Sequence, residues 1–124
     1  HLLALRESQQ QLSLAIGAAA LGIWDYDQKR GTLVWNSRWC EILGVQRSTE
    51  VGPLSCWYER VHDEDRERVV GLLQAHLTGE APLFAAEYRL LAGDGRWLWV
   101  QDRGTIVERT VQGQPLRLIG MVQD

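Results

Sequence analysis

The last third of this sequence indicates three strands joined by two tight turns, and this run constrains the fold more than any other feature. Residues 83–91, 97–107 and 116–122 have the alternating, β-rich character of strands. Gly93-Asp94-Gly95 and Gln112-Gly113 supply the turns between them. The turns are too short for a crossover helix, so the three strands must be antiparallel neighbours in one sheet.

The first two thirds of the chain supply a hairpin and all of the predicted helices. In the helix over residues 63–77 we expect Asp63 to cap the first turn and Val69, Leu72, Leu73 and Leu77 to form the apolar stripe. The sequence therefore predicts an α+β fold with helices grouped on one face of the sheet. The predicted elements are a helix over 1–20, strands over 23–27 and 32–35, a helix over 37–43, an irregular stretch over 45–62 with a helical turn near 56–60, and the helix over 63–77.

Composition excludes several classes of protein. The chain has 124 residues, of which 45% are hydrophobic and 23% charged, as in one globular domain. A net charge of -3 gives no basic field, so we expect no nucleic-acid partner. The longest apolar stretch, residues 14–24, is too short to cross a bilayer and has no signal-peptide character, so we expect no membrane insertion. Two cysteines do not make a disulfide framework, which predicts a cytoplasmic location.

Apolar residues recur at heptad spacing in the first helix. The repeat is shorter than a coiled coil normally needs, so the helix either packs on its own domain or joins two protomers. We expect the second, a homodimer. The residues on a and d positions are Leu2, Leu5, Leu12, Ile16 and Ala19, with Gln9 as a polar a position.

The outward positions of two predicted strands are also apolar. Ile23, Ile119 and Met121 would face away from the helices, which is not typical of a sheet surface in contact with water. We expect this outer face to take part in the dimer together with the first helix.

Several short segments occur in an order that one family shares. They are Gly22-Ile23-Trp24-Asp25-Tyr26-Asp27, Val34-Trp35-Asn36, Val61-His62-Asp63-Glu64-Asp65-Arg66, Glu87-Tyr88-Arg89, Asp102-Arg103-Gly104 and Ile119-Gly120-Met121-Val122-Gln123-Asp124. Together they resemble a PAS domain with a C-terminal PAC motif. The resemblance implies a five-stranded antiparallel sheet with short helices on one face, enclosing a small cavity and preceded by an amphipathic helix. It places the linker or dimerisation helix at 1–20 and the PAS domain at 21–124. Asp124 is similar to the Asp that opens the connection to an effector domain.

The resemblance implies a regulatory module without activity of its own. We expect a sensory or signal-relay module of a larger bacterial signalling protein, a histidine kinase or a GGDEF/EAL cyclic-di-GMP enzyme, that acts on a covalently linked effector through dimer rearrangement. The alternative is a PAS sensor that binds a small molecule or a cofactor. A stand-alone α+β enzyme would have to use His62-Asp63-Glu64-Asp65, but capping and the helix dipole already explain these residues. No catalytic or metal site is predicted.

Alternation along the strands, together with the resemblance, gives a candidate set of residues that face the cavity. Large rings dominate the set. Either they fill the cavity and the module is a relay without a ligand, or a small apolar molecule fits among them. The candidates are Trp24, Tyr26, Trp39, Leu43, Trp57, Val69, Leu73, Tyr88, Leu90, Leu98, Val100, Leu118 and Val122.

We expect no cofactor in this cavity. Haem-binding PAS domains place a His on the long helix, where this chain has Val69, and His76 lies two turns further on as the remaining haem candidate. Cys56 has the spacing of the photoactive cysteine in flavin-binding PAS domains. The amides that would read a flavin ring are replaced by Leu90 and Val100.

Overall fold

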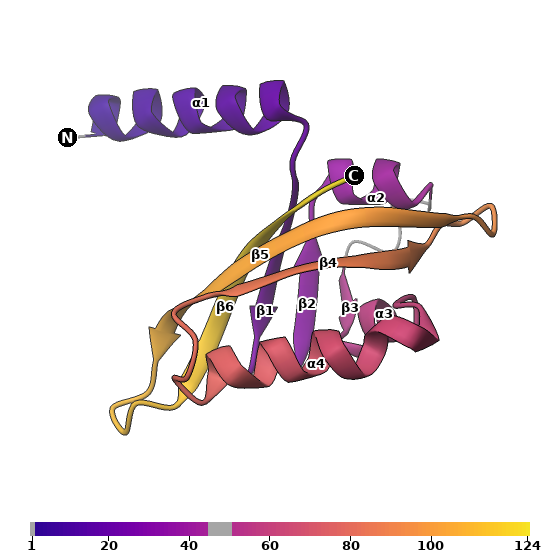
Figure 1. Ribbon diagram of the computed structural model, residues 1–124. Helices are drawn as coiled ribbons and strands as arrows, with labels where there is room; N and C mark the ends of the chain where they lie inside the picture. Colours follow the sequence, from indigo (N-terminus) through magenta and orange to yellow (C-terminus); the bar gives the residue numbers. More distant parts are fainter. Residues whose placement is uncertain (1, 45–50) are drawn as a thin grey trace.

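The computed structural model describes residues 2–44 and 51–124, with the side chains of residues 16–19 and 51 left out. Within this part of the chain the fold is α+β, as predicted, with a curled antiparallel sheet (Figure 1). The elements are α1 (Leu2–Ala19), β1 (Gly22–Asp27), β2 (Thr32–Trp35), α2 (Ser37–Leu43), β3 (Val51–Pro53), α3 (Ser55–Tyr58), α4 (Asp63–Leu77), β4 (Phe84–Leu91), β5 (Trp97–Arg109) and β6 (Pro115–Gln123).

The sheet has six strands in the described residues, one more than the five predicted. Its order is β3-β2-β1-β6-β5-β4, and each pair of neighbours is antiparallel. The additional strand, β3, pairs with the edge of β2 through three residues. We predicted an irregular stretch over residues 45–62, but residues 51–53 form an edge strand, which tolerates Pro53 although a proline cannot donate to a strand ladder. The predicted meander β4-β5-β6 is present in order.

A single asparagine joins the hairpin to the first short helix. Asn36 is the N-cap of α2, and its Oδ1 accepts from the backbone N–H of Trp39 at 3.1 Å. The same oxygen accepts from the backbone N–H of Ile23 on β1 at 3.0 Å. Gly44 then ends the helix in the left-handed region, with φ of 65°. These contacts hold Trp39 of α2 over the inner face of the sheet.

Two details of the prediction for α4 were wrong. The N-cap is His62, whose side chain accepts from the backbone N–H of Glu64 at 3.1 Å, and Asp63 is the first helical residue. Leu72 is exposed, because the buried face follows the i, i+4 row through Asp65, Val69 and Leu73. Fewer positions of α4 therefore face the core than the predicted apolar stripe contains, because Leu72 is exposed.

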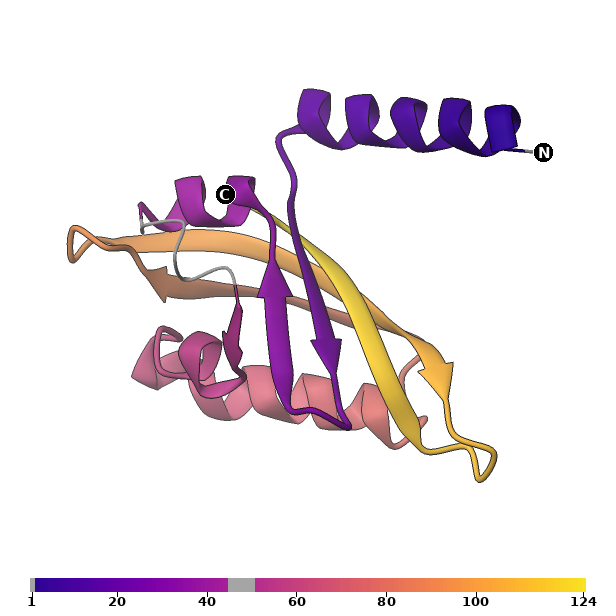
Figure 2. The same ribbon diagram turned by 180° about the vertical axis from the view of Figure 1, so that it is seen from behind.

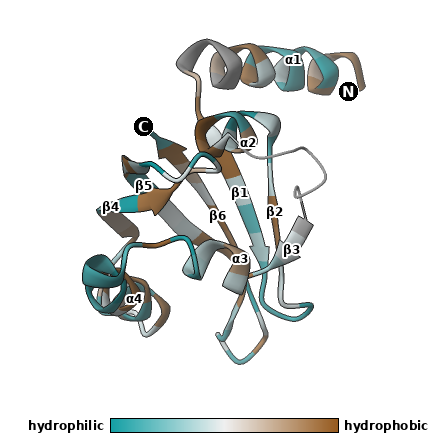
Figure 3. Ribbon diagram, turned by 90° about the vertical axis from the view of Figure 1, so that its right-hand side faces the viewer, coloured by the Kyte–Doolittle hydropathy of each residue, from teal (hydrophilic) through white to brown (hydrophobic). Residues whose placement is uncertain are grey.

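Helix α1 lies apart from the sheet in both views of the ribbon (Figures 1 and 2). It joins β1 through Ala20 and Leu21, and hydrophobic and hydrophilic residues share its length (Figure 3). Gly22, at the start of β1, pairs with Val122, near the end of β6. The point where α1 enters the sheet is therefore beside the point where the chain leaves it. No helix in the described residues is long and apolar enough to cross a membrane.

Candidate functional site

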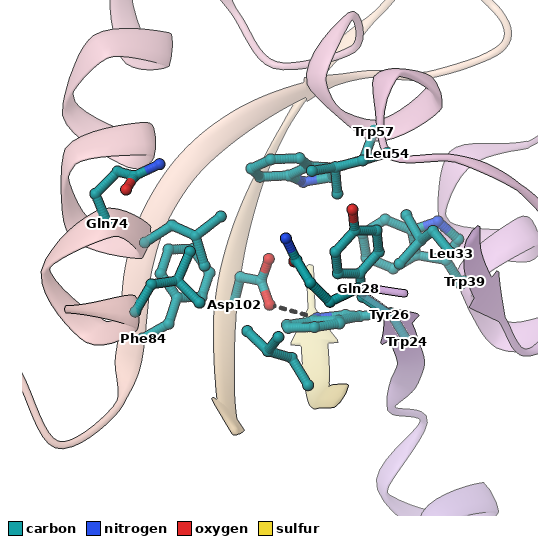
Figure 4. Close-up of a pocket in the computed structure, with 13 residues that line it drawn as sticks. Trp24, Tyr26, Gln28, Leu33, Trp39, Leu54, Trp57, Gln74, Phe84 and Asp102 are labelled. Atoms are coloured by element: carbon teal, nitrogen blue, oxygen red, sulfur yellow. Dashed lines mark hydrogen bonds between the residues drawn. The ribbon is translucent and has the colours of Figure 1, made fainter. Parts of the chain in front are cut away.

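A cavity of about 200 Å³ lies between the inner face of the sheet and the helices α2, α3 and α4 (Figure 4). Aromatic rings and leucine side chains form most of its wall. Polar groups in the wall come from Gln28, Gln74 and Asp102, together with the Tyr26 hydroxyl and the indole N–H groups of the tryptophans. The lining residues are Trp24, Tyr26, Gln28, Leu33, Trp39, Leu54, Trp57, Leu73, Gln74, Leu77, Phe84, Asp102 and Leu118.

The indole ring of Trp24 forms one side of this cavity because two glycines leave room for it. Trp24 on β1 lies opposite Gly120 on β6, and Gly120 lies opposite Gly104 on β5. A Cβ atom at either glycine would clash with the Trp24 ring. The ring therefore lies across the inner face of neighbouring strands, and its Nε1–H reaches Asp102 on β5.

Two chains of hydrogen bonds end on the carboxylate of Asp102. Trp57 Nε1 donates to the Tyr88 hydroxyl at 2.8 Å, and this hydroxyl donates to Asp102 Oδ2 at 2.6 Å. Trp24 Nε1 donates to Asp102 Oδ1 at 2.8 Å. The Trp57 and Tyr88 rings meet edge to face, with centroids 6.1 Å apart. The network fixes two rings of the cavity wall relative to one carboxylate.

Burial raises the pKa of Asp102 to about 6, because the charged form loses its hydration. The hydrogen bonds from Tyr88 and Trp24 favour the charged form but do not offset the burial. The pKa of Tyr88 is raised well above its ordinary value, first by burial and then by the negative charge of Asp102. The cavity therefore contains an acid whose charge changes at about pH 6.

The structure brings only part of the predicted set to this cavity. The cavity lies nearer to Gly104 and Gly120 than we predicted, and away from the end of β5 that carries Leu98 and Val100. Trp24, Tyr26, Trp39, Trp57, Leu73 and Leu118 line the cavity. Val69, Tyr88, Val100 and Val122 are buried in the surrounding core, Leu43 and Leu90 line a second hollow, and Leu98 is half-buried.

Asp102 is the residue that the sequence analysis missed. The inward positions of β5 alternate through Val100, Asp102 and Gly104, and all three are buried. An acid at an inward position between apolar neighbours is a local signal that alternation could have found. Asp102 entered the prediction only as part of the segment Asp102-Arg103-Gly104. The other lining residues outside the predicted set are Gln28, Leu33, Leu54, Gln74, Leu77 and Phe84.

The two residues considered for cofactors have other surroundings. The backbone N–H of Ile106 donates to His76 Nε2 at 3.1 Å, and His76 Nδ1 lies 3.0 Å from the carbonyl oxygen of Ala81. Both ring nitrogens are thus engaged by the backbone, and neither faces the cavity as a haem ligand would. Cys56 lines the second hollow and not the cavity that contains Asp102.

The acidic segment at the start of α4 is occupied by structural contacts. Asp65 Oδ2 accepts from the backbone N–H and the Nε of Arg89, at 2.9 and 3.0 Å. Asp65 Oδ1 accepts from Arg89 Nη2 at 2.9 Å. Arg89 holds the pKa of Asp65 well below its ordinary value. Asp65 therefore joins α4 to β4 through Arg89.

The residues predicted for dimer formation lie on α1, on the outer sheet face and at the chain end. Leu5 and Leu12 are exposed, and Ile16 belongs to the side chains outside the described part. Ile23 and Ile119 are half-buried, while Met121 is exposed. The carboxylate of Asp124 lies 3.5 Å from Arg38 Nη2 on α2.

Comparison with known proteins identifies the family to which the chain belongs. The probable diguanylate cyclase DgcE of Escherichia coli (strain K12) is 25% identical over 121 residues, which are 96% of this chain and 10% of that protein. The chain therefore spans about a tenth of the length of this relative.

Two solved structures share the fold. One is a sensory box histidine kinase/response regulator from Burkholderia thailandensis E264, with a TM-score of 0.80 and 28% identity, covering 92% of this chain and 83% of that one. The other is the N-terminal domain of a diguanylate cyclase with PAS/PAC sensor from Marinobacter aquaeolei, with a TM-score of 0.72 and 25% identity, covering 84% and 94%. The family model of the PAS fold matches residues 32–122. The chain belongs to the PAS fold family, whose members are regulatory sensory domains.

Proposed function

We propose that this sensory module regulates a covalently linked effector domain by changing the arrangement of two protomers. The observation that carries the proposal is the exposure of leucines on α1. Leu5 and Leu12 are 55% and 62% exposed, although heptad spacing places both on one face. A second copy of the helix is the partner that a heptad pattern fits.

The outer face of the sheet supports the same interface. Met121 lies between Ile23 and Arg103 on neighbouring strands, and Ile119 lies beside Asp25 and Thr105. Since β1 begins where β6 ends, a change in sheet packing would act on α1 and on the exit of the chain together. Such coupling can bias a two-state dimer.

The effector that we propose is a histidine kinase or a cyclic-di-GMP enzyme. The support is the kind of protein in which the similar domains occur, a histidine kinase and two diguanylate cyclases. We place the module in the cytoplasm, which is consistent with Cys40 and Cys56 being free thiols.

Sedimentation velocity of three chains that contain residues 1–124 tests the dimer. We expect the wild type and Gln10→Glu to form dimers as concentration rises, and Leu12→Glu to remain monomeric. The reason is that Leu12 lies on the apolar face of α1 and Gln10 does not. Gln10 is the matched control, since it is exposed on the same helix. A monomeric wild type, or a Leu12→Glu chain that dimerises as strongly as the control, would refute the proposal.

The cavity favours a second function, the binding of a small molecule. The support is the chemistry of its wall, which is mostly apolar and contains a few polar groups, as ligand sites do. We expect the purified chain to show no haem or flavin absorption and to release a small colourless molecule on denaturation, detected by mass spectrometry. A chain that releases none, and that no compound small enough for the cavity stabilises, would contradict this function.

A further inference from the structure

We propose that the cavity binds a small organic cation, an ammonium or amidinium group on an apolar or aromatic body, with Asp102 as its counter-ion. This inference rests on the proposed ligand-binding function and specifies the chemistry of its ligand. It follows from charge, from the rings around the carboxylate and from the shape of the space.

The charge argument concerns the surroundings of Asp102. Its side chain is buried, and in residues 2–44 and 51–124 no ion pair includes its carboxylate. The partners it does have, Trp24 and Tyr88, are neutral donors. A buried carboxylate normally needs a cationic partner to offset the loss of hydration. A bound cation would supply the charge that the described part of the protein does not.

The rings of the wall favour the same class of ligand. Figure 4 shows the indoles of Trp57 and Trp24 on opposite sides of the space into which the Asp102 carboxyl points. Tyr26 and Phe84 complete the wall around this space. The faces of aromatic rings attract cations, most strongly those of tryptophan and where water is excluded. An anion would be repelled by both the carboxylate and the ring faces.

The size and the opening of the cavity limit the ligand. Its volume of about 200 Å³ lies below the roughly 300–1,000 Å³ of sites for drug-sized molecules, so one ring with a short charged arm is the scale that fits. Gln28 and Gln74 line the cavity and are exposed, so they mark its mouth. Their amide oxygens can accept further hydrogen bonds from an ammonium group.

A head-group series on one ring tests the inference. Benzylammonium, benzyl alcohol and benzoate differ mainly in charge, and each can be titrated into the full chain while its tryptophan fluorescence is followed. We expect benzylammonium to bind at least about tenfold more tightly than benzyl alcohol, which is about 1.4 kcal/mol. Benzoate should bind most weakly.

Two variants locate the charge preference. Asp102→Asn keeps the size of the side chain and an acceptor oxygen, so it should reduce the affinity for benzylammonium to that for benzyl alcohol. Asp94→Asn removes an exposed carboxylate in the β4–β5 turn and should leave the preference unchanged. Near-ultraviolet circular dichroism checks that both variants fold. If Asp102→Asn does not fold, the head-group series on the wild type still tests the proposal.

The outcomes separate this inference from the function on which it rests. Benzyl alcohol that binds as tightly as benzylammonium would show a ligand cavity without a charge preference, so the cation proposal alone would fail. An Asp102→Asn chain that retains the preference would equally overturn it. A wild type whose fluorescence responds to none of the three would overturn the cation proposal, while released native ligand would still support the ligand-binding function.

Discussion

Two buried aspartates of this protein have opposite electrostatic surroundings. Asp65 is 5% exposed and Asp102 is 2% exposed, so burial alone does not separate them. Asp65 receives three hydrogen bonds from Arg89 and lies 3.5 Å from Arg68, and its pKa is lowered. Asp102 receives hydrogen bonds from two neutral side chains, and burial raises its pKa to about 6.

The difference shows what each carboxylate does for the molecule. The charge of a buried acid that pairs with an arginine is already neutralised within the protein. The pair of Asp65 and Arg89 joins α4 to β4. A buried acid with only neutral donors lowers the free energy of unfolding at neutral pH, compared with an uncharged side chain in the same place. Buried acids without a cationic partner are uncommon in purely structural positions, whereas groups with shifted pKa values are frequent at functional sites. Asp102 is therefore the functional candidate of the two aspartates.

Replacing Asp65 should give the largest effect. Asp65→Asn removes the negative charge that Arg89 faces and should lower the free energy of unfolding by about 3 kcal/mol, the low end for breaking a buried pair because Arg89 is partly exposed. Urea unfolding at pH 7 measures this value. Glu67→Gln, an exposed position on the same helix, is the control and should change little. A loss no larger than that of the control would remove the distinction between the two aspartates.

The second prediction concerns the pH dependence of stability. The folded chain keeps a proton on Asp102 up to about pH 6, whereas the unfolded chain releases it near pH 4. By linkage, this group contributes stability at low pH that is lost as pH rises through that window, by about 2–3 kcal/mol. Unfolding curves of the wild type and Asp102→Asn between pH 4 and 8 isolate this contribution. Above pH 6 the variant should be relatively more stable, and parallel pH profiles would contradict the assignment.

The third and smallest effect concerns the glycines beneath Trp24. Gly120→Ala places a methyl group against the Trp24 ring and the backbone carbonyl oxygen of Arg103, so the ring must shift and its hydrogen bond to Asp102 weaken. We expect a loss of about 1–2 kcal/mol and a change in tryptophan fluorescence. Gly71→Ala is the control, because the helical Gly71 has open space around it and alanine should stabilise the helix slightly. Unchanged fluorescence in Gly120→Ala would show that the ring does not depend on the glycine.

Most of the fold could be predicted because its signals are local. Two tight turns specified the meander, and the helix predicted over residues 37–43 is α2, which Asn36 caps and Gly44 ends. The additional strand β3 was missed because three residues containing Gly52-Pro53 form it only through pairing with β2. That pairing is a property of the sheet and not of the segment.

The cavity was less predictable than the fold because its position depends on missing side chains. Gly104 and Gly120 lie on different strands, and only their pairing makes room for Trp24. Trp24 and Tyr26, which alternation directs inward, line the cavity, but alternation treats each strand as evenly filled. The role of Asp102 depends on Tyr88 and Trp24, which are distant in sequence, so its inward position alone indicated burial and not its partners.

The charge state of Asp102 is the most direct test of this account. Carbon-13 NMR of aspartate side-chain carboxyls, with Asp102→Asn to assign the resonance, measures the pKa of that carboxyl in the free full chain. We predict a pKa of about 6 for Asp102, with Asp65 still ionised well below the ordinary range. An Asp102 pKa at or below the ordinary value of about 3.9 would show that the chain already provides its counter-charge, and would contradict the account.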